Sequence, residues 1–243
     1  MLTGLLGFWA LAGNAGASEL ELSGSAVGGA LVCDYVDLAD EVDSVSGPGL
    51  HLARSFSNTA ALSFNAPDAA FAQLPLTLNF WAKFPVGFDA GSGSIPWAWN
   101  CGDIWGPPFS AYHYAGATYI TVRDVDAGGL AAANLLTAFC DDAWHMWTLV
   151  LDEDWNLSIY IDGLPNGEFA LLEEDYAPPT GTVLEGEVMD SLTFGNSKFA
   201  GALNGTCGSG HAMAMIGIWN RELTAGEVAQ LYNGGDGLGF SEL

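Results

Sequence analysis

Apolar and polar residues alternate at every second position in many short segments of this chain, and no other feature constrains its fold as strongly. The clearest segment is residues 76–83, in which Leu, Leu, Phe and Ala alternate with Thr, Asn, Trp and Lys. Successive side chains of a β-strand point to opposite faces, so one face is expected to enter a core while the other faces outward. The pattern predicts a protein built mainly of strands.

The same period predicts a hairpin in the middle of the chain. Residues 147–151 alternate in this way, Asp152–Asp154 turn the chain, and residues 157–161 alternate again before Asp162–Gly163. An Asp-Gly pair favours the tight turn that closes a hairpin. Between clusters of Gly and Pro, further strands are expected at residues 5–11, 61–64, 118–122, 192–194 and 213–219.

One short helix is expected near the C-terminus. Thr224 and Glu227 have the spacing of a capping box, in which each side chain binds a backbone N–H at the start of a helix. Val228 and Leu231 would form its apolar face, and Asn233–Gly234 would end it.

Strands without intervening helices predict an all-β fold with two antiparallel sheets packed face to face. The expected architecture is a jelly-roll sandwich that forms one domain over residues 1–243. The sequence has 32 Gly, 13 Phe, 9 Trp and 7 Tyr, which suits strands joined by tight turns. It shows no repeat of fixed period and no linker.

The opening residues imitate a secretory signal. An apolar run over residues 5–11 precedes Ala15-Gly16-Ala17, but the basic residues that begin such a signal are absent. We therefore expect the segment to be retained as a strand. No apolar run is long enough for a membrane-spanning helix, so membrane insertion is not expected.

Charge narrows the classes of partner. The chain has 5 Lys and Arg against 29 Asp and Glu, a formal net charge of −24, so nucleic acid and anionic lipid surfaces would repel it. Charged residues make up 14% and apolar residues 50% of the sequence. A composition with so few charged and so many apolar residues favours a protein that is partly buried against neighbouring subunits.

The order of these motifs resembles that of the LamG-like jelly rolls of the concanavalin A-like lectin and glucanase superfamily. The resemblance spans most of the chain and implies a concanavalin A-like fold. It says little about a ligand, because the matching positions are structural. The matching segments are residues 4–9, 61–64, 76–83, 144–145, 157–163, 192–196 and 216–224, followed by Glu227 and Leu231-Tyr232.

Aromatic residues give the strongest sequence evidence for a binding surface, because a sugar ring stacks its apolar side on an aromatic face beside amide or carboxylate hydrogen-bond partners. By alternation, three aromatic residues fall on outward strand faces, and three Trp crowd a Gly- and Pro-rich loop with an Asn and an Asp. The alternative is that they pack beneath loops or against another subunit. The candidates are Trp81, Trp97, Trp99, Asn100, Asp103, Trp105, Tyr119 and Tyr160.

Catalysis is not expected. Some relatives on this fold are retaining glycosidases, which hold two carboxylates about 5 Å apart across the sugar bond. Glu185, Glu187 and Asp190 imitate that spacing, but the family order is Glu, Asp, Glu and the run lies late in the chain. No catalytic residue is therefore assigned.

No cofactor is expected, although calcium could be held by acidic loops. The densest acidic cluster comprises Asp34, Asp37, Asp40, Glu41 and Asp43, and no residue is assigned to an ion.

The histidines and cysteines show no metal-binding spacing. We interpret His145 as a hydrogen-bonding residue at the end of a strand. The cysteines allow three disulfide pairings that the sequence does not distinguish, and buried free thiols are expected. They are Cys33, Cys101, Cys140 and Cys207.

Three hypotheses for function remain. The first is a non-enzymatic structural or surface-display protein of a particle, such as a capsid decoration or tail-associated subunit of a phage virion. It would contact other particle subunits or copies of itself, be made in the host cytoplasm, and could also hold cell-surface glycans. The second is a free, extracellular carbohydrate-binding lectin or adhesin, and the third is a glucanase.

Overall fold

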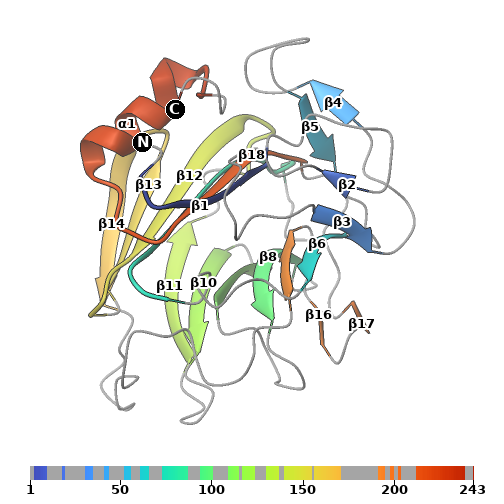
Figure 1. Cartoon of the computed structure of the whole chain (residues 1–243), viewed down its shortest axis with the longest axis horizontal. Helices are drawn as coiled ribbons and strands as arrows, with labels where there is room; N and C mark the ends of the chain where they lie inside the picture. Colours follow the sequence, from blue (N-terminus) through green and yellow to red (C-terminus); the bar gives the residue numbers. More distant parts are fainter. Residues whose placement is uncertain are drawn as a thin grey trace.

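The computed structural model contains two eight-stranded antiparallel sheets that pack against each other, with a short helix outside the first sheet (Figure 1). The predicted fold class, an all-β jelly-roll sandwich with one short C-terminal helix, is confirmed. In the part of the chain that is described, no helix is long and apolar enough to cross a bilayer. The structure describes residues 3–9, 18–19, 31–34, 41–43, 52–55, 61–65, 73–86, 94–100, 109–114, 117–123, 130–136, 140–154, 156–170, 191–194, 198–199, 202–203, 212–238 and 243.

The first sheet has strand β18 (Ala212–Trp219) near its centre. On one side β18 pairs with β7 (Leu76–Lys83). On the other side it pairs with β5 (Leu52–Ser55) through Ala212 and Met213, and with β1 (Leu5–Trp9) through residues 216–219. In spatial order the other strands are β14 (Leu164–Ala170), β13 (Asn156–Ile161), β12 (Trp144–Leu151), β7 (Leu76–Lys83), β18 (Ala212–Trp219), β5 (Leu52–Ser55) and β4 (Glu41–Asp43).

The second sheet faces the first. In spatial order its strands are β11 (Leu130–Leu136), β10 (Ala117–Arg123), β9 (Phe109–Tyr114), β8 (Ser94–Asn100), β15 (Ser191–Phe194), β6 (Ala61–Asn65), β3 (Leu31–Asp34) and β2 (Ser18–Glu19). Two further short strands, β16 (Lys198–Phe199) and β17 (Ala202–Leu203), pair only with each other.

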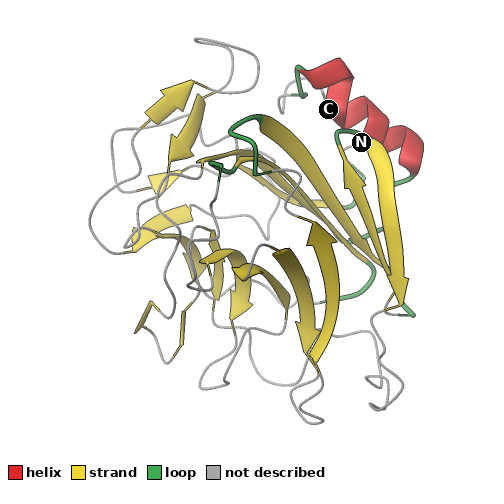
Figure 2. Cartoon of the chain, turned by 180° about the vertical axis from the view of Figure 1, so that it is seen from behind, coloured by secondary structure: helices red, strands yellow, loops and turns green. Residues whose placement is uncertain are grey.

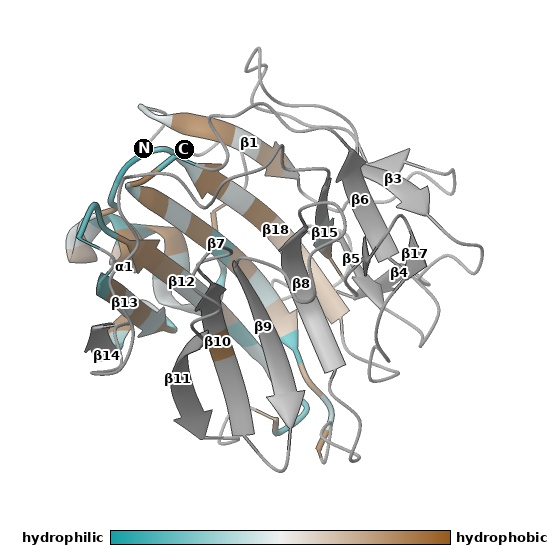
Figure 3. Ribbon diagram, turned by 90° about the horizontal axis from the view of Figure 1, so that it is seen from below, coloured by the Kyte–Doolittle hydropathy of each residue, from teal (hydrophilic) through white to brown (hydrophobic). Residues whose placement is uncertain are grey.

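The central strands of the first sheet are buried on both faces. The expected alternation is visible along β7 (Figure 3), yet nearly every residue of β7, β12 and β18 is buried. On β7, Asn79 belongs to the face turned away from the second sheet. Its amide is satisfied by the Trp147 carbonyl at 3.2 Å and the Thr148 hydroxyl at 2.8 Å. A polar group buried in this way needs such partners to avoid a desolvation cost.

Helix α1 (Ala225–Tyr232) covers the outer face of the first sheet (Figure 2). The predicted capping box is present, the predicted residues Val228 and Leu231 are buried, and Asn233 ends the helix in the left-handed conformation. Burying two such side chains contributes roughly 1.5–3 kcal/mol each. An isolated helix of eight residues is only marginally stable in water. Packing against the first sheet therefore supplies most of the stability of helix α1.

The opening apolar segment is a strand, as predicted. It forms β1 over Leu5–Trp9, and the last two residues of the expected span lie outside the described residues. The strands that were not predicted are β2, β3, β4, β5, β8, β9, β11, β14, β16 and β17. β14 contains Pro165 and Gly167, and β11 contains four Ala and Asn residues in a row, all types depleted in strands.

Candidate functional site

The predicted sugar-binding residues fall in three places. Trp97, Trp99 and Asn100 belong to strand β8, so the prediction that they lie in a loop is wrong for these three residues. Tyr119 belongs to β10 of the same sheet. Trp81 and Tyr160 belong to the first sheet. Asp103 and Trp105 lie outside the described residues.

Strand register divides the candidates of the second sheet into two rows. Position 97 pairs with Phe194 on β15 and with Ala111 on β9, which in turn pairs with Ile120. Phe194 and Ile120 are buried. Position 119 pairs with Tyr112, one residue further along. Since adjacent positions of a strand belong to opposite faces, positions 97 and 119 belong to different faces of the sheet.

Trp81 requires a correction to the expectation of an outward aromatic face. It does lie on the face away from the second sheet, but it is only 2% exposed. Tyr232 of helix α1 stacks on it, with ring centroids 5.7 Å apart, and Gly237 approaches its indole. Alternation predicts on which face of the sheet a residue lies, but not whether another element covers that face. Because helix α1 covers this face, Trp81 is a core residue.

Tyr160 is half-buried and packs against the same cluster. The cluster joins the outer face of the first sheet to helix α1 and includes Phe8, Trp219 and Val228. The ring of Tyr160 therefore contributes to the contact between sheet and helix.

A histidine cluster, which we define as Asp141, His145 and Asp162, lies at the start of β12. His145 Nδ1 is 2.7 Å from Asp162 Oδ2, and His145 Nε2 is 3.2 Å from Asp141 Oδ1. Carboxylates only accept hydrogen bonds, so the doubly protonated ring satisfies both contacts. The prediction of a strand-end hydrogen bonder is confirmed.

The charges of this cluster favour the imidazolium. The hydrogen bond to the Asp162 carboxylate raises the pKa of His145 above its ordinary value of 6.5, against the opposing effect of burial. Asp162 also accepts from the Met146 backbone N–H at 2.9 Å. The pKa of Asp141 is lowered, first by a hydrogen bond from the Ala143 backbone and also by His145.

The Asp162–Gly163 turn explains this geometry. Both residues have positive φ, 54° and 76°, as a tight turn between β13 and β14 requires. The turn directs the Asp162 carboxylate back to β12. The predicted turn is present, but it opens a second hairpin with β14 in addition to the β12–β13 hairpin.

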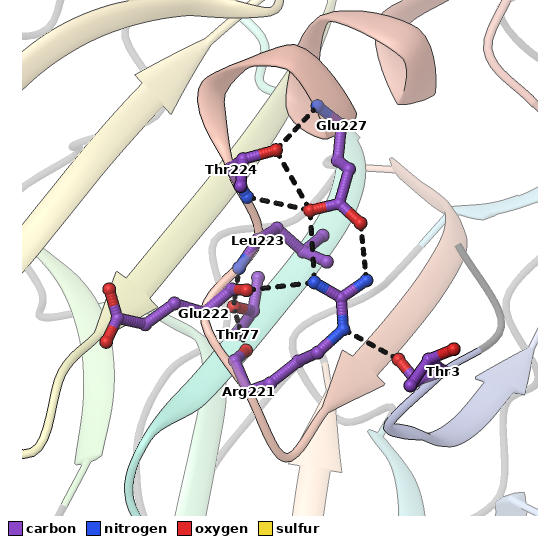
Figure 4. A network of polar contacts seen from close by, with 7 residues as sticks. All are labelled: Thr3, Thr77, Arg221, Glu222, Leu223, Thr224 and Glu227. Carbon is purple, nitrogen blue, oxygen red and sulfur yellow. Dashed lines mark hydrogen bonds and ion pairs between the residues drawn. The ribbon is translucent and has the colours of Figure 1, made fainter.

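A second polar group joins segments from the two ends of the chain (Figure 4). We call it the terminal network and define it as Thr3, Thr77, Arg221, Thr224 and Glu227. Two nitrogens of Arg221 contact the Glu227 carboxylate, at 2.6 and 3.0 Å, and its Nε donates to the Thr3 carbonyl at 2.7 Å.

The network also fastens the segment between β18 and helix α1. The Thr77 hydroxyl donates to the Arg221 carbonyl at 2.7 Å and accepts from Leu223 N–H at 3.1 Å. The Glu227 carboxylate accepts from Thr224 as well. The contacts with Arg221 and Thr224 lower the pKa of Glu227 from 4.5 to about 2. These contacts hold Thr3 and the segment before helix α1 against the first sheet.

The acidic clusters give no ion site among the described residues. No group of three or more metal-ligating side chains lies together there. Asp34 belongs to β3, whereas Glu41 and Asp43 belong to β4 of the other sheet. The Asp152 carboxylate accepts from Asn156 and from a turn N–H, as a turn residue does. Asp37, Asp40, Glu185, Glu187 and Asp190 lie outside the described residues.

Sequence reasoning missed the terminal network. Arg221 is one of only five basic residues in a chain of net charge −24, and that scarcity was the available signal that its position matters. Its partner Thr3, however, is 218 residues away, and no periodicity links such positions.

Two facing antiparallel sheets and an outer helix define a lectin-like β-sandwich. Similar solved structures include the binding domain of Paraclostridial Mosquitocidal Protein 1, with 14% identity and a TM-score of 0.65 over 96% of this chain and 52% of that one. The botulinum neurotoxin serotype G binding domain has 14% identity and a TM-score of 0.65, over 94% and 50% of the two chains.

The receptor binding domain of botulinum neurotoxin D is also similar, with 11% identity and a TM-score of 0.64 over 96% and 53% of the two chains. This chain therefore spans about half the length of each of these structures. At such identities the likeness establishes the fold. No protein-family model and no curated protein matches the sequence.

Proposed function

We propose that this chain is a non-enzymatic binding module that recognises glycans on a surface. One observation carries the proposal: the fold matches solved binding domains over 94–96% of this chain. The formal charge of −24 favours a neutral or basic ligand, since an anionic ligand would be repelled.

The second sheet supplies the proposed sugar-binding surface. Tyr119 on β10 and Tyr112 on β9 are paired across neighbouring strands, on the opposite face from the buried Ile120. Two neighbouring aromatic residues are a suitable platform for a sugar ring. Trp97, Trp99, Asn100, Asp103 and Trp105 remain proposed members of the surface, although the register of position 97 favours a packing role.

We also place the module on a particle. The proposed setting is the surface of a phage virion, as a capsid decoration or tail-associated subunit, with residues 1–243 forming one concanavalin A-like domain of the LamG type. The low charged fraction of 14% and the apolar fraction of 50% support burial against other subunits. A free extracellular lectin is the alternative setting.

A glycan array probed with the purified chain tests recognition, and titration of the best glycan then compares variants. Tyr119→Ala is expected to raise the dissociation constant about two- to tenfold, because loss of one stacked ring costs roughly 0.5–1.5 kcal/mol. Leu164→Ala, which truncates a side chain 69% exposed on the first sheet, is the matched control and should bind normally. No bound glycan, or equal binding by both variants, contradicts the proposal.

The variant Trp97→Ala tests whether position 97 belongs to the core or to the ligand surface. If position 97 packs in the core, this variant loses thermal stability and keeps the glycan affinity of the folded fraction. Loss of affinity at unchanged stability assigns Trp97 to the ligand surface instead. Mass spectrometry of intact particles from the source tests the setting, because a virion subunit is found in fixed ratio to a shell protein.

A further inference from the structure

Two Asn-Gly pairs in the described part of the chain have the same chemistry but different backbone conformations. Asn166–Gly167 lies within β14, and Asn233–Gly234 lies at the end of helix α1. Both asparagines are exposed, so exposure does not distinguish them. A third pair, Asn204–Gly205, lies outside the described residues.

An asparagine that precedes a glycine can lose its side-chain amide without an enzyme. The glycine backbone nitrogen attacks the asparagine Cγ, the bond from Cγ to Nδ2 breaks, and ammonia leaves with the proton that the backbone nitrogen gives up. Water then opens the resulting succinimide ring to aspartate or isoaspartate. Glycine has no Cβ to hinder this approach. For the ring to close, the glycine nitrogen must rotate until it eclipses the asparagine Cβ.

The backbone of Asn233 opposes this rotation. Its φ and ψ are 50° and 42°, the left-handed conformation that ends helix α1. At this ψ, the tetrahedral geometry of Cα places the nitrogen of Gly234 on the opposite side from the Asn233 Cβ. The Asn233 Nδ2 also donates to the Gly237 carbonyl at 3.2 Å, and its backbone N–H donates to the Ala229 carbonyl. The helix end must therefore come apart before this ring can close.

The backbone at Asn166 is less restrictive. On β13 and β14, Ile159 pairs with Gly167 and Tyr160 pairs with Pro165, so Asn166 is an extra residue between two paired positions. The extra residue of a β-bulge is left out of the ladder, which is locally disrupted. In the extended or right-handed conformations of such residues, the following nitrogen lies about a quarter turn from eclipsing Cβ, rather than opposite to it.

We propose that Asn166 is a site of spontaneous modification, at which the folded chain converts asparagine to aspartate or isoaspartate while Asn233 is preserved. The bulge also allows the fold to keep the product. Isoaspartate adds one carbon to the backbone, but at a residue that is already extra to the ladder, with paired positions on both sides. The modified chain therefore stays folded and carries one negative charge beyond the −24 of the sequence, since the new carboxyl group is ionised at neutral pH. This reaction requires neither the glycan nor the particle proposed above.

Incubation of the full chain at mildly alkaline pH, followed by peptide mapping, compares both sites within one molecule. Chymotrypsin cleaves after Tyr160, Phe169 and Tyr232, so the two asparagines fall in different peptides. Digestion at mildly acidic pH limits further reaction during handling. Mass spectrometry then measures the fraction of each asparagine that has become an acid, and electron-transfer fragmentation separates aspartate from isoaspartate.

In the folded chain, Asn166 should react about tenfold faster than Asn233, because Asn233 must first lose its hydrogen bond to Gly237 and its place at the helix end. In the chain unfolded by denaturant, both asparagines precede a glycine in a flexible backbone, so the two rates should converge. Two results would overturn the proposal: an Asn166 that stays intact in the folded chain, or a ratio of rates that is the same in folded and unfolded chains.

The variant Asn166→Gln is the matched control. It keeps the amide group and the charge, but its side chain would have to close a six-membered ring, which forms far more slowly. This variant should show no acid at position 166 after the same incubation. Aged samples of the original chain and of the variant should unfold at the same temperature, because the bulge tolerates the product. A lower unfolding temperature in the aged original chain alone would contradict that tolerance.

Discussion

The terminal network and the histidine cluster each fasten the end of a strand of the first sheet, and they respond to pH in opposite directions. In the terminal network the critical group is the Glu227 carboxylate, whose pKa falls from 4.5 to about 2. In the histidine cluster it is the His145 ring, whose pKa rises above 6.5. Both clusters depend on a cation beside a carboxylate. In the terminal network the shifted group is the carboxylate, whereas in the histidine cluster it is the cation.

The signs follow from linkage between protonation and folding. A lowered carboxyl pKa stabilises the fold above pH 4.5, and that contribution is lost as the pH falls toward 2. A raised histidine pKa stabilises the fold fully below pH 6.5, and that contribution is lost as the pH rises through the folded value. Both networks are therefore at full strength between about pH 4.5 and 6.5.

The largest effect is expected from breaking the terminal network. Arg221→Ala removes both contacts with Glu227 and the bond to the Thr3 carbonyl. Because the ion pair is about one quarter exposed, we expect a loss of about 2 kcal/mol, measured by chemical denaturation at pH 6.

Lys83→Ala is the matched control for this variant, since it removes a more exposed ion pair with Asp142. Its expected cost is about 0–1 kcal/mol. Equal losses for the two variants would show that the forked geometry of Arg221 adds nothing.

The histidine cluster should give a smaller, pH-dependent effect. His145→Gln removes the titrating group and should cost about 1 kcal/mol at pH 5.5. The difference from the original chain should shrink at higher pH, where the ring is neutral and loses one of its carboxylate bonds. Denaturation curves collected across this range measure it, and a constant difference from pH 5 to 9 would contradict the assigned protonation.

The smallest effect should come from the cap alone. Thr224→Ala removes a side chain that accepts from the Glu227 backbone N–H at 3.3 Å, while the ion pair with Arg221 stays. The expected loss is about 0.5 kcal/mol, at the low end for the loss of a cap. Thr224→Ser keeps the hydroxyl and should restore most of it, and a loss as large as that of Arg221→Ala would mean that the two contacts act as one unit.

What the sequence could predict was local or periodic. The capping box at Thr224, the turn at Asp162–Gly163 and the alternation of residues 76–83 involve neighbours in the chain, so their physics is readable without a fold. The face of Trp81 was correctly placed by alternation, but its cover, Tyr232, comes from a helix 151 residues later.

The candidate site was less predictable for the same reason. Whether an aromatic residue meets solvent or core depends on which strands become neighbours, as the pairing of position 97 with Phe194 shows. The protonation of His145 likewise depends on Asp162 arriving from the next strand. The repulsion of anions stays a prediction from composition, and it can be made without a fold because it depends on total charge alone.

The position of β18 has a consequence for how the chain reaches its folded state. This late strand pairs with β7 on one side and with both β1 and β5 on the other. The hydrogen-bonded ladder of the first sheet is therefore interrupted until residues 212–219 are available. Contacts this remote in sequence slow folding, since a long loop must close before they form. On the ribosome, the earlier strands therefore wait with open edges, and we expect maturation after synthesis to be the vulnerable period of this protein.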